Sequence, residues 1–162
     1  MPREVGTALV RYDFVNPFVS SAREILEEVL AGRIDAGKIR LSPAPLSSRG
    51  VTAIVGVTGE GEGRVLFDMS RETALAIATE MNDEPQTDLG LLAKDTLSEL
   101  ASMMTGRAIS ILNDRGHRLR VSPPTLIAGD NVTFSNSELE TLVVPLETAW
   151  GEVVVNVAMV TV

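Results

Sequence analysis

The sequence contains no cysteine and a single histidine among its 162 residues. Without cysteine the chain has no disulfide framework, no thiolate metal site and no cysteine nucleophile, and one histidine cannot build a histidine-rich metal site. No apolar run approaches the roughly 18 residues of a transmembrane helix. Residues 1–10 mix acidic and basic side chains and lack the apolar core of a signal peptide. We therefore expect a cytoplasmic protein.

Positive charge is also scarce, because 14 Lys and Arg stand against 22 Asp and Glu, which gives a net charge of −8. Nucleic acids and anionic membranes attract clustered positive charge, so we expect neither of them as a partner. An acidic surface is compatible with a basic patch on a partner protein. Hydrophobic residues make up 44% of the chain and charged residues 22%, a balance that excludes wholesale disorder.

Hydrophobic periodicity predicts the order helix, strands, helices, strands. The first helix is expected over 17–31, with Asn16 as its N-cap and Pro17 in its first position. A second helix capped by a serine is expected over 70–81, and a longer helical stretch over 88–112. The segments typical of strands are 38–41, 51–58, 64–69, 119–122, 132–135, 141–147 and 152–162.

The two halves of the chain share three short matches in the same order. They are Gly32-Arg33 with Gly106-Arg107, Arg40-Leu41-Ser42-Pro43 with Arg120-Val121-Ser122-Pro123, and Thr58-x-x-Gly61-Glu62 with Thr148-x-x-Gly151-Glu152. Either a duplicated unit or chance repetition explains them. We predict an α+β fold, with helices on one face of a mostly antiparallel sheet and an internal pseudo-duplication. One domain is expected over 1–162, with an N-terminal segment 1–14 and halves of about 15–81 and 88–162.

The long predicted helix separates its side chains into two faces. An apolar stripe recurs at helical spacing and is expected to face the core; it consists of Ala93, Leu97, Leu100, Ala101, Met104, Ala108 and Ile111. The opposite side carries two carboxylates and two small residues, at about 140–200° from the stripe at 100° per residue; they are Asp95, Glu99, Ser102 and Gly106. Met103 flanks this row. Periodicity alone leaves two interpretations, a solvated face or a surface that meets a partner.

The row belongs to a longer motif, Asp95-x-x-x-Glu99-Leu-Ala-Ser102-Met-Met-Thr-Gly106-Arg-Ala. This stretch resembles the signature helix of the CheC/CheX family of chemotaxis phosphatases, which has Asp or Ser, then Glu, then Asn and later a proline. The likeness is greatest to CheX-like members and extends from about residue 15 to residue 160. It includes Val15-Asn16-Pro17-Phe18, the hairpin segment 57–65 with the helix after it, and Ser122-Pro123-Pro124-Thr125.

The resemblance implies roles for individual residues. In this family the Glu pairs with a lysine of a phosphorylated receiver protein, and the Asn holds the water that attacks the aspartyl phosphate. Glu99 and Ser102 are thereby implied as the catalytic pair. The expected contacts to the partner come from Asp95, Glu99, Met103 and Gly106. Ser102 departs from the family, because a hydroxyl reaches less far than the carboxamide of Asn and offers fewer hydrogen-bonding groups.

The first predicted helix carries a weaker copy of the row, Ser20-x-x-x-Glu24-x-x-Glu27. Glu27 stands at the Asn position, where a carboxylate would repel an incoming phosphoryl group. We interpret this copy as inactive and expect it to be an ordinary solvated face.

Other residues that invite a functional interpretation are predicted to be structural. Gly59, Gly61 and Gly63 lie between two predicted strands, with no helix N-terminus to receive a phosphate. His117 is expected at the surface of a loop, and Trp150 is expected to cap the end of the sheet.

Three functions remain open at this stage. The first is a CheX-like protein that binds a phosphorylated CheY-type response regulator and promotes hydrolysis of its aspartyl phosphate, in chemotaxis or another two-component circuit. The second is a non-catalytic receiver-binding adaptor that lost the chemistry at Ser102. The third, a small-molecule sensor, has no polar pocket signature behind it.

The resemblance also bears on cofactors and assembly. No cofactor of the chain's own is expected, because the receiver would supply Mg²⁺ and an acidic pocket. CheX-like relatives form a homodimer by joining sheets, so we expect a homodimer here. The apolar segment 153–162 is a candidate for such an edge.

Overall fold

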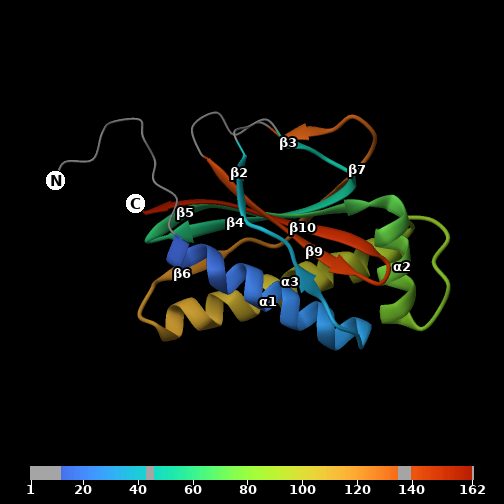
Figure 1. Ribbon diagram of the computed structural model, residues 1–162, viewed down its shortest axis with the longest axis horizontal. Helices are drawn as coiled ribbons and strands as arrows, with labels where there is room; N and C mark the ends of the chain where they lie inside the picture. The colour runs from blue at the N-terminus through green and yellow to red at the C-terminus, as the bar shows by residue number, and fades with distance from the viewer. Residues whose placement is uncertain (1–11, 43–45, 135–139, 162) are drawn as a thin grey trace.

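The computed structural model describes residues 12–42, 46–134 and 140–161. In this part of the chain three helices pack against a largely antiparallel sheet (Figure 1), which confirms the predicted α+β class. The helices are α1 (Tyr12–Leu30), α2 (Arg71–Asn82) and α3 (Leu91–Asp114). The strands are β1 (Asp35–Ala36), β2 (Arg40–Ser42), β3 (Leu46–Ser47), β4 (Gly50–Gly59), β5 (Gly61–Ser70), β6 (Leu119–Val121), β7 (Thr125–Ala128), β8 (Thr133–Phe134), β9 (Thr141–Thr148) and β10 (Gly151–Thr161).

The two halves of the chain interleave in one sheet of order β1-β9-β10-β5-β4-β6, in which β2 also pairs with β9 and β7 with β4. Each half forms a hairpin, β4–β5 or β9–β10. The short strands β1 and β2 pair with β9 of the other half, and β6 and β7 pair with β4. The remaining short strands, β3 and β8, pair with each other in a separate two-stranded sheet. The hairpins meet at the centre through antiparallel β5 and β10. This exchange supports the predicted pseudo-duplication, because the pairing of one half mirrors that of the other.

The three sequence matches differ in how they relate to this symmetry. The hairpin match is equivalent, since both copies lie at a turn, β4–β5 in one half and β9–β10 in the other. Arg40–Ser42 forms β2, whereas Arg120 and Val121 belong to β6, whose place is equivalent to that of β1. Gly32 follows the end of α1, whereas Gly106 lies inside α3. The symmetry between the two halves is therefore a symmetry of strand pairing. Two of the three sequence matches join positions that are not equivalent under it.

The first helix begins earlier than predicted. It starts at Tyr12, and Pro17 lies inside it instead of at its first position. Phe14 and Val15 are fully buried and extend the apolar face by another turn before the proline. Residues 12–14 of the predicted N-terminal segment 1–14 thus belong to α1, and 1–11 lie outside the described residues.

The other two helices follow the predictions closely. Ser70 caps α2 by accepting a hydrogen bond from the Thr73 N–H at 3.1 Å. The apolar stripe of α3 is buried as predicted, except that Ile111 is half-buried and Leu112 is fully buried in its place. None of the helices in the described chain is long and apolar enough to cross a membrane.

The C-terminal strand occupies the middle of the sheet. β10 is hydrogen-bonded to β9 on one side and to β5 on the other. The prediction that segment 153–162 could supply an exposed edge is therefore wrong for its described residues. In the described sheet the outer positions belong to the short strands β1, β2, β6 and β7.

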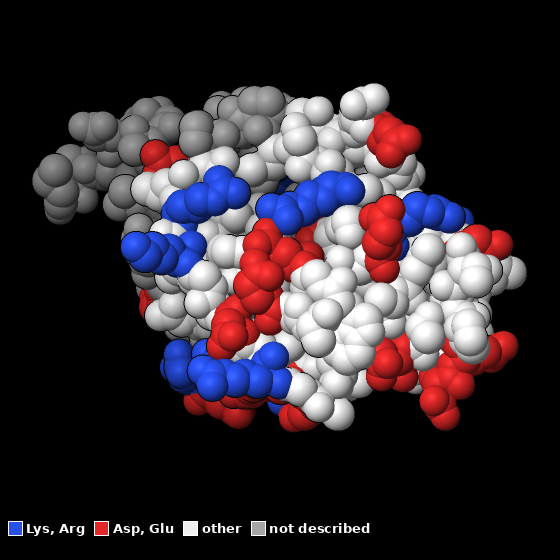
Figure 2. All heavy atoms as spheres, turned by 45° about the vertical axis from the view of Figure 1, so that its right-hand side comes forward, with Lys and Arg blue, Asp and Glu red and all other residues white. Residues whose placement is uncertain are grey.

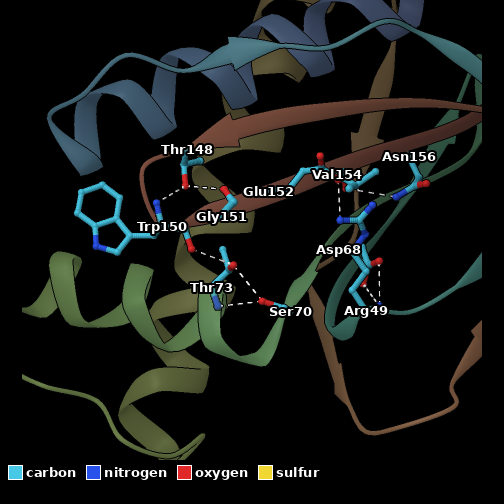
Figure 3. A network of polar contacts seen from close by, with 10 residues as sticks. All are labelled: Arg49, Asp68, Ser70, Thr73, Thr148, Trp150, Gly151, Glu152, Val154 and Asn156. Carbon is cyan, nitrogen blue, oxygen red and sulfur yellow. Dashed lines mark hydrogen bonds and ion pairs between the residues drawn. The ribbon is translucent and has the colours of Figure 1, made fainter.

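Polar contacts fix one end of the central β5–β10 pair, where β5 ends and β10 begins (Figure 3). The Trp150 carbonyl accepts a hydrogen bond from Thr73 Oγ1 at 3.1 Å, and the half-buried indole packs against the core. This confirms Trp150 as a cap on the end of the sheet. On the helix-free face, buried Asp68 accepts hydrogen bonds from Thr52 Oγ1 at 2.8 Å and from the Arg49 N–H at 3.1 Å.

Candidate functional site

The row predicted from periodicity lies on the outer face of α3. Asp95, Glu99 and Ser102 are exposed, and a Cβ added at Gly106 would meet nothing within 4 Å. On the opposite side of the same helix the stripe around Leu97 is buried against the core. One helix therefore separates a packing face from a polar face, as its sequence predicted.

The polar groups of this row have no partners within the chain as described. The carboxylates of Asp95 and Glu99 and the hydroxyl of Ser102 form no ion pair or side-chain hydrogen bond with any described residue. At 1.5 Å of rise per residue, the row from Asp95 to Gly106 extends over about 16 Å. It thus presents two carboxylates, a hydroxyl and an open backbone position along one accessible line.

Met103 differs from the other four predicted site residues. It is half-buried and packs against the hydrophobic core. Its side chain lies at the border between the polar face and the core, so only part of it is accessible from the polar face.

An ion-pair cluster joins α3 to α1 beside the row. Arg107 donates to the two carboxylate oxygens of Glu28 at 2.9 and 3.2 Å and to Glu24 at 3.4 Å. The hydrogen bond from Arg107 lowers the pKa of Glu28, and the same bond raises the pKa of Arg107. We call these three residues the Arg107 cluster.

The weaker copy of the row on α1 is occupied by contacts within the chain. Glu24 belongs to the Arg107 cluster, and Glu27 accepts a hydrogen bond from the Ile34 N–H at 3.3 Å. Ser20 is 3.4 Å from the Pro17 carbonyl, to which its hydroxyl donates. The two copies therefore differ in availability as well as in sequence, which supports the interpretation of the α1 copy as inactive.

His117 is not the surface residue that the sequence suggested. Its Nδ1 contacts the Glu60 carboxylate, and its ring lies edge-on to Phe14 with centroids 4.9 Å apart. The side chain is 23% exposed. These contacts hold the end of α3 against the β4–β5 turn, so the histidine has a structural explanation. The glycines of that hairpin are also structural, since a Cβ at Gly63 would lie 1.9 Å from the Ala158 carbonyl oxygen.

Sequence reasoning missed two features of this region. Leu91 and Leu92, in the first turn of α3, are exposed, and Arg107 was given no partner. The exposure of the two leucines could have been predicted from the sequence, because helical geometry places them about 120° and 220° from Leu97, outside the core stripe. The contacts of Arg107 depend on how α1 packs against α3, which periodicity within one helix does not determine.

Fold and surface together define a class of protein. Two interleaved halves build an α+β domain in which one helix exposes a carboxylate row, and solved CheC-like proteins have this fold. The CheC-like superfamily protein from Shewanella sp. PV-4 superposes with a TM-score of 0.83, covering 93% of this chain and 99% of that one at 24% identity. The family model for the chemotaxis phosphatase CheX matches residues 51–147, and the chain belongs to this family.

Two relatives are closer in sequence. The protein named CheY-P phosphatase CheX, from Thermotoga maritima, is 28% identical over 127 residues, which are 75% of this chain and 79% of that protein. CheX from Borrelia burgdorferi, solved in a complex with CheY, BeF₃ and Mg²⁺, is 32% identical. Its TM-score is 0.79, and the match covers 92% of this chain and 99% of that one.

Proposed function

We propose that this protein binds a phosphorylated CheY-type response regulator and promotes hydrolysis of its aspartyl phosphate. The exposed row on α3, whose polar side chains have no partner among the described residues, carries the proposal, because it offers a receiver two carboxylates and a hydroxyl on one face. The relatives support it, since one is named a CheY-P phosphatase and another was solved with CheY.

Each residue of the row has a chemical task in this proposal. Glu99 pairs with a lysine of the receiver, and Asp95, one helical turn earlier, extends the contact. Ser102, three residues after Glu99, lies on the same face and orients the water that attacks phosphorus. Gly106 leaves space at the far end of the row. Such a reaction needs mainly positioning, because the receiver brings the phosphoryl group and the Mg²⁺ that balances its charge.

Replacing Glu99 by alanine tests the proposal. Loss of a positioning group commonly lowers a rate by about 10²-fold, so Glu99→Ala should lengthen the lifetime of the phosphorylated receiver towards that of the receiver alone. Glu80→Ala is a matched control, because Glu80 is an exposed glutamate on α2. A wild-type chain that neither binds a CheY-type receiver nor shortens the lifetime of its phosphate would refute the proposal.

A non-catalytic adaptor is the second candidate, and Ser102 is the observation that favours it. A serine hydroxyl has less reach and fewer hydrogen-bonding groups than an asparagine carboxamide. An adaptor would bind the phosphorylated receiver and leave its lifetime unchanged. Measuring binding and phosphate release on the same sample separates the two candidates.

Location and assembly are further parts of the proposal. A cytoplasmic location follows from action on a soluble receiver, and secretion of the chain would contradict it. A homodimer is proposed with its contact outside β10, whose two edges are both paired. Measuring the molar mass in solution tests it, and a monomer at micromolar concentration would rule it out.

A further inference from the structure

Two adjacent leucines are exposed where α3 begins. Leu91 is 83% exposed and Leu92 is 47% exposed, whereas Ala93, the next residue, is completely buried. Among the described residues, the other large hydrophobic side chains of comparable exposure are Ile39 and Leu41, near and in the edge strand β2. Scattered exposed leucines are ordinary, but an adjacent pair beside a candidate binding surface is an indication of contact with a partner.

The leucine pair, Leu91 and Leu92, brackets the carboxylate row. Around the helix axis the two side chains leave at about 120° and 220° from Leu97, on either side of Asp95 and Glu99 at about 160° and 200°. Along the axis Leu91 precedes Asp95 by about 6 Å, and Leu92 precedes Glu99 by about 10 Å. One partner surface laid along the row would therefore cover the pair as well.

The row by itself offers a partner little apolar surface. Its residues are two carboxylates, a serine and a glycine, and stable interfaces have an apolar centre with few charges. The leucine pair supplies apolar side chains next to the row, on the same rigid helix.

The charges around the pair argue for a partner of opposite sign over a second copy of this chain. From residue 88 to residue 102 the exposed charged side chains are Asp88, Lys94, Asp95 and Glu99. Figure 2, which brings the α2 side forward, shows mainly acidic side chains on its right-hand part. A twofold contact between copies would set each patch against itself and bring these carboxylates together.

We propose that Leu91 and Leu92 are a docking pad for the receiver and set its affinity, while Glu99 and Ser102 act on the phosphate. The inference rests on the proposed function, because the receiver is the partner that covers the pad. It predicts apolar residues on the receiver beside the basic group that meets Glu99.

A double variant, Leu91→Ser with Leu92→Ser, separates docking from chemistry. Both side chains are exposed, so the fold should persist, and the thermal midpoint checks this. The dissociation constant for a CheY-type receiver carrying BeF₃⁻ and Mg²⁺ should rise about tenfold, a loss typical of removing central interface contacts. The rate of phosphate release at saturating protein should change by less than about twofold. Leu41→Ser is the matched control, because Leu41 is 51% exposed but lies on β2.

The other outcomes distinguish a failed pad from a failed function. If the double variant binds as tightly as wild type while Glu99→Ala weakens phosphate release, the pad is refuted and the proposed function stands. If the double variant changes the molar mass in solution and keeps the receiver affinity, the pair belongs to contact between copies. If wild type binds no receiver, both proposals are refuted.

Discussion

Arg107 of α3 donates two hydrogen bonds to the carboxylate of Glu28 on α1, at 2.9 and 3.2 Å. This bidentate pair joins the helix that carries the row to its neighbour. Both side chains are accessible to solvent, so salt screens the attraction. Arg107→Met should lower the thermal midpoint at low ionic strength by more than it does in concentrated salt. Arg120→Met on β6 is the control, because Arg120 is exposed and forms no ion pair with a described residue.

The same pair predicts a pH dependence. Arg107 lowers the pKa of Glu28 below the ordinary value of 4.5. A carboxyl group with a lowered folded-state pKa stabilises the fold above its ordinary pKa, and this stabilisation is lost as pH falls through the lowered value. Thermal midpoints of wild type and Arg107→Met should therefore differ at neutral pH and converge below pH 4.5. A difference that persists undiminished at the lowest pH would assign the effect to packing.

A second pH dependence of opposite sign is predicted at the β9–β10 hairpin. Glu147 lies directly opposite Glu152 across the two strands. Its hydrogen bond with Glu152, then desolvation and the repulsion between the carboxylates, raise the pKa of Glu147, which Arg49 partly offsets. The folded state thus holds a proton to higher pH than the unfolded state does. Stability contributed by this proton is lost as pH rises from 4.5 through the raised value.

Glu147→Gln should therefore stabilise the fold at neutral pH. Like charges directly opposite on antiparallel strands destabilise by about 0.5 kcal/mol, and the exposure of Glu147 keeps the gain near or below that value. Urea unfolding at pH 7 and pH 4 measures the gain, which should shrink at the lower pH. Glu62→Gln is the matched control, because Glu62 faces Val160 across its strand pair. A loss of stability at pH 7 would contradict the argument.

The sequence predicted the parts of the fold that local patterns determine. The stripe and the row of α3 follow from helical periodicity, and the Ser70 cap and the hairpin at 57–65 follow from local chemistry. The start of α1 was placed five residues late, because a proline at a helix start is a local preference that burial of Phe14 overrode. The position of β10 depends on which strands pair across the two halves, and no local pattern contains that information.

The candidate site likewise has features that local sequence patterns predict and features that depend on tertiary packing. Exposure of Asp95, Glu99 and Ser102 was predictable because all three lie on one helix, whose geometry is regular. The Arg107 cluster and the His117–Glu60 contact join residues 79 and 57 positions apart in the chain. Such contacts follow from helix packing and hairpin placement, so they become visible only in the folded structure.

At position 102 this sequence has a serine where the family signature has an asparagine. The resemblance to the CheC/CheX signature implies an asparagine there that holds the attacking water, whereas this chain has Ser102, which is exposed. Ser102→Asn should restore a group with the reach to orient that water, and we expect phosphate release from a matched receiver to accelerate by about 10-fold to 100-fold.

Ser110→Asn makes the same chemical change at an exposed position of α3, about 12 Å further along the helix. It should leave the rate as it is, since a carboxamide there lies beyond the row. Receiver affinity should be similar in wild type and both variants, because Glu99 and Asp95 are intact. An unchanged rate in Ser102→Asn, with binding retained, would place the protein among the adaptors. A lower rate would mean that the hydroxyl of Ser102 itself orients the water, and that the wild-type serine is an adapted catalytic group.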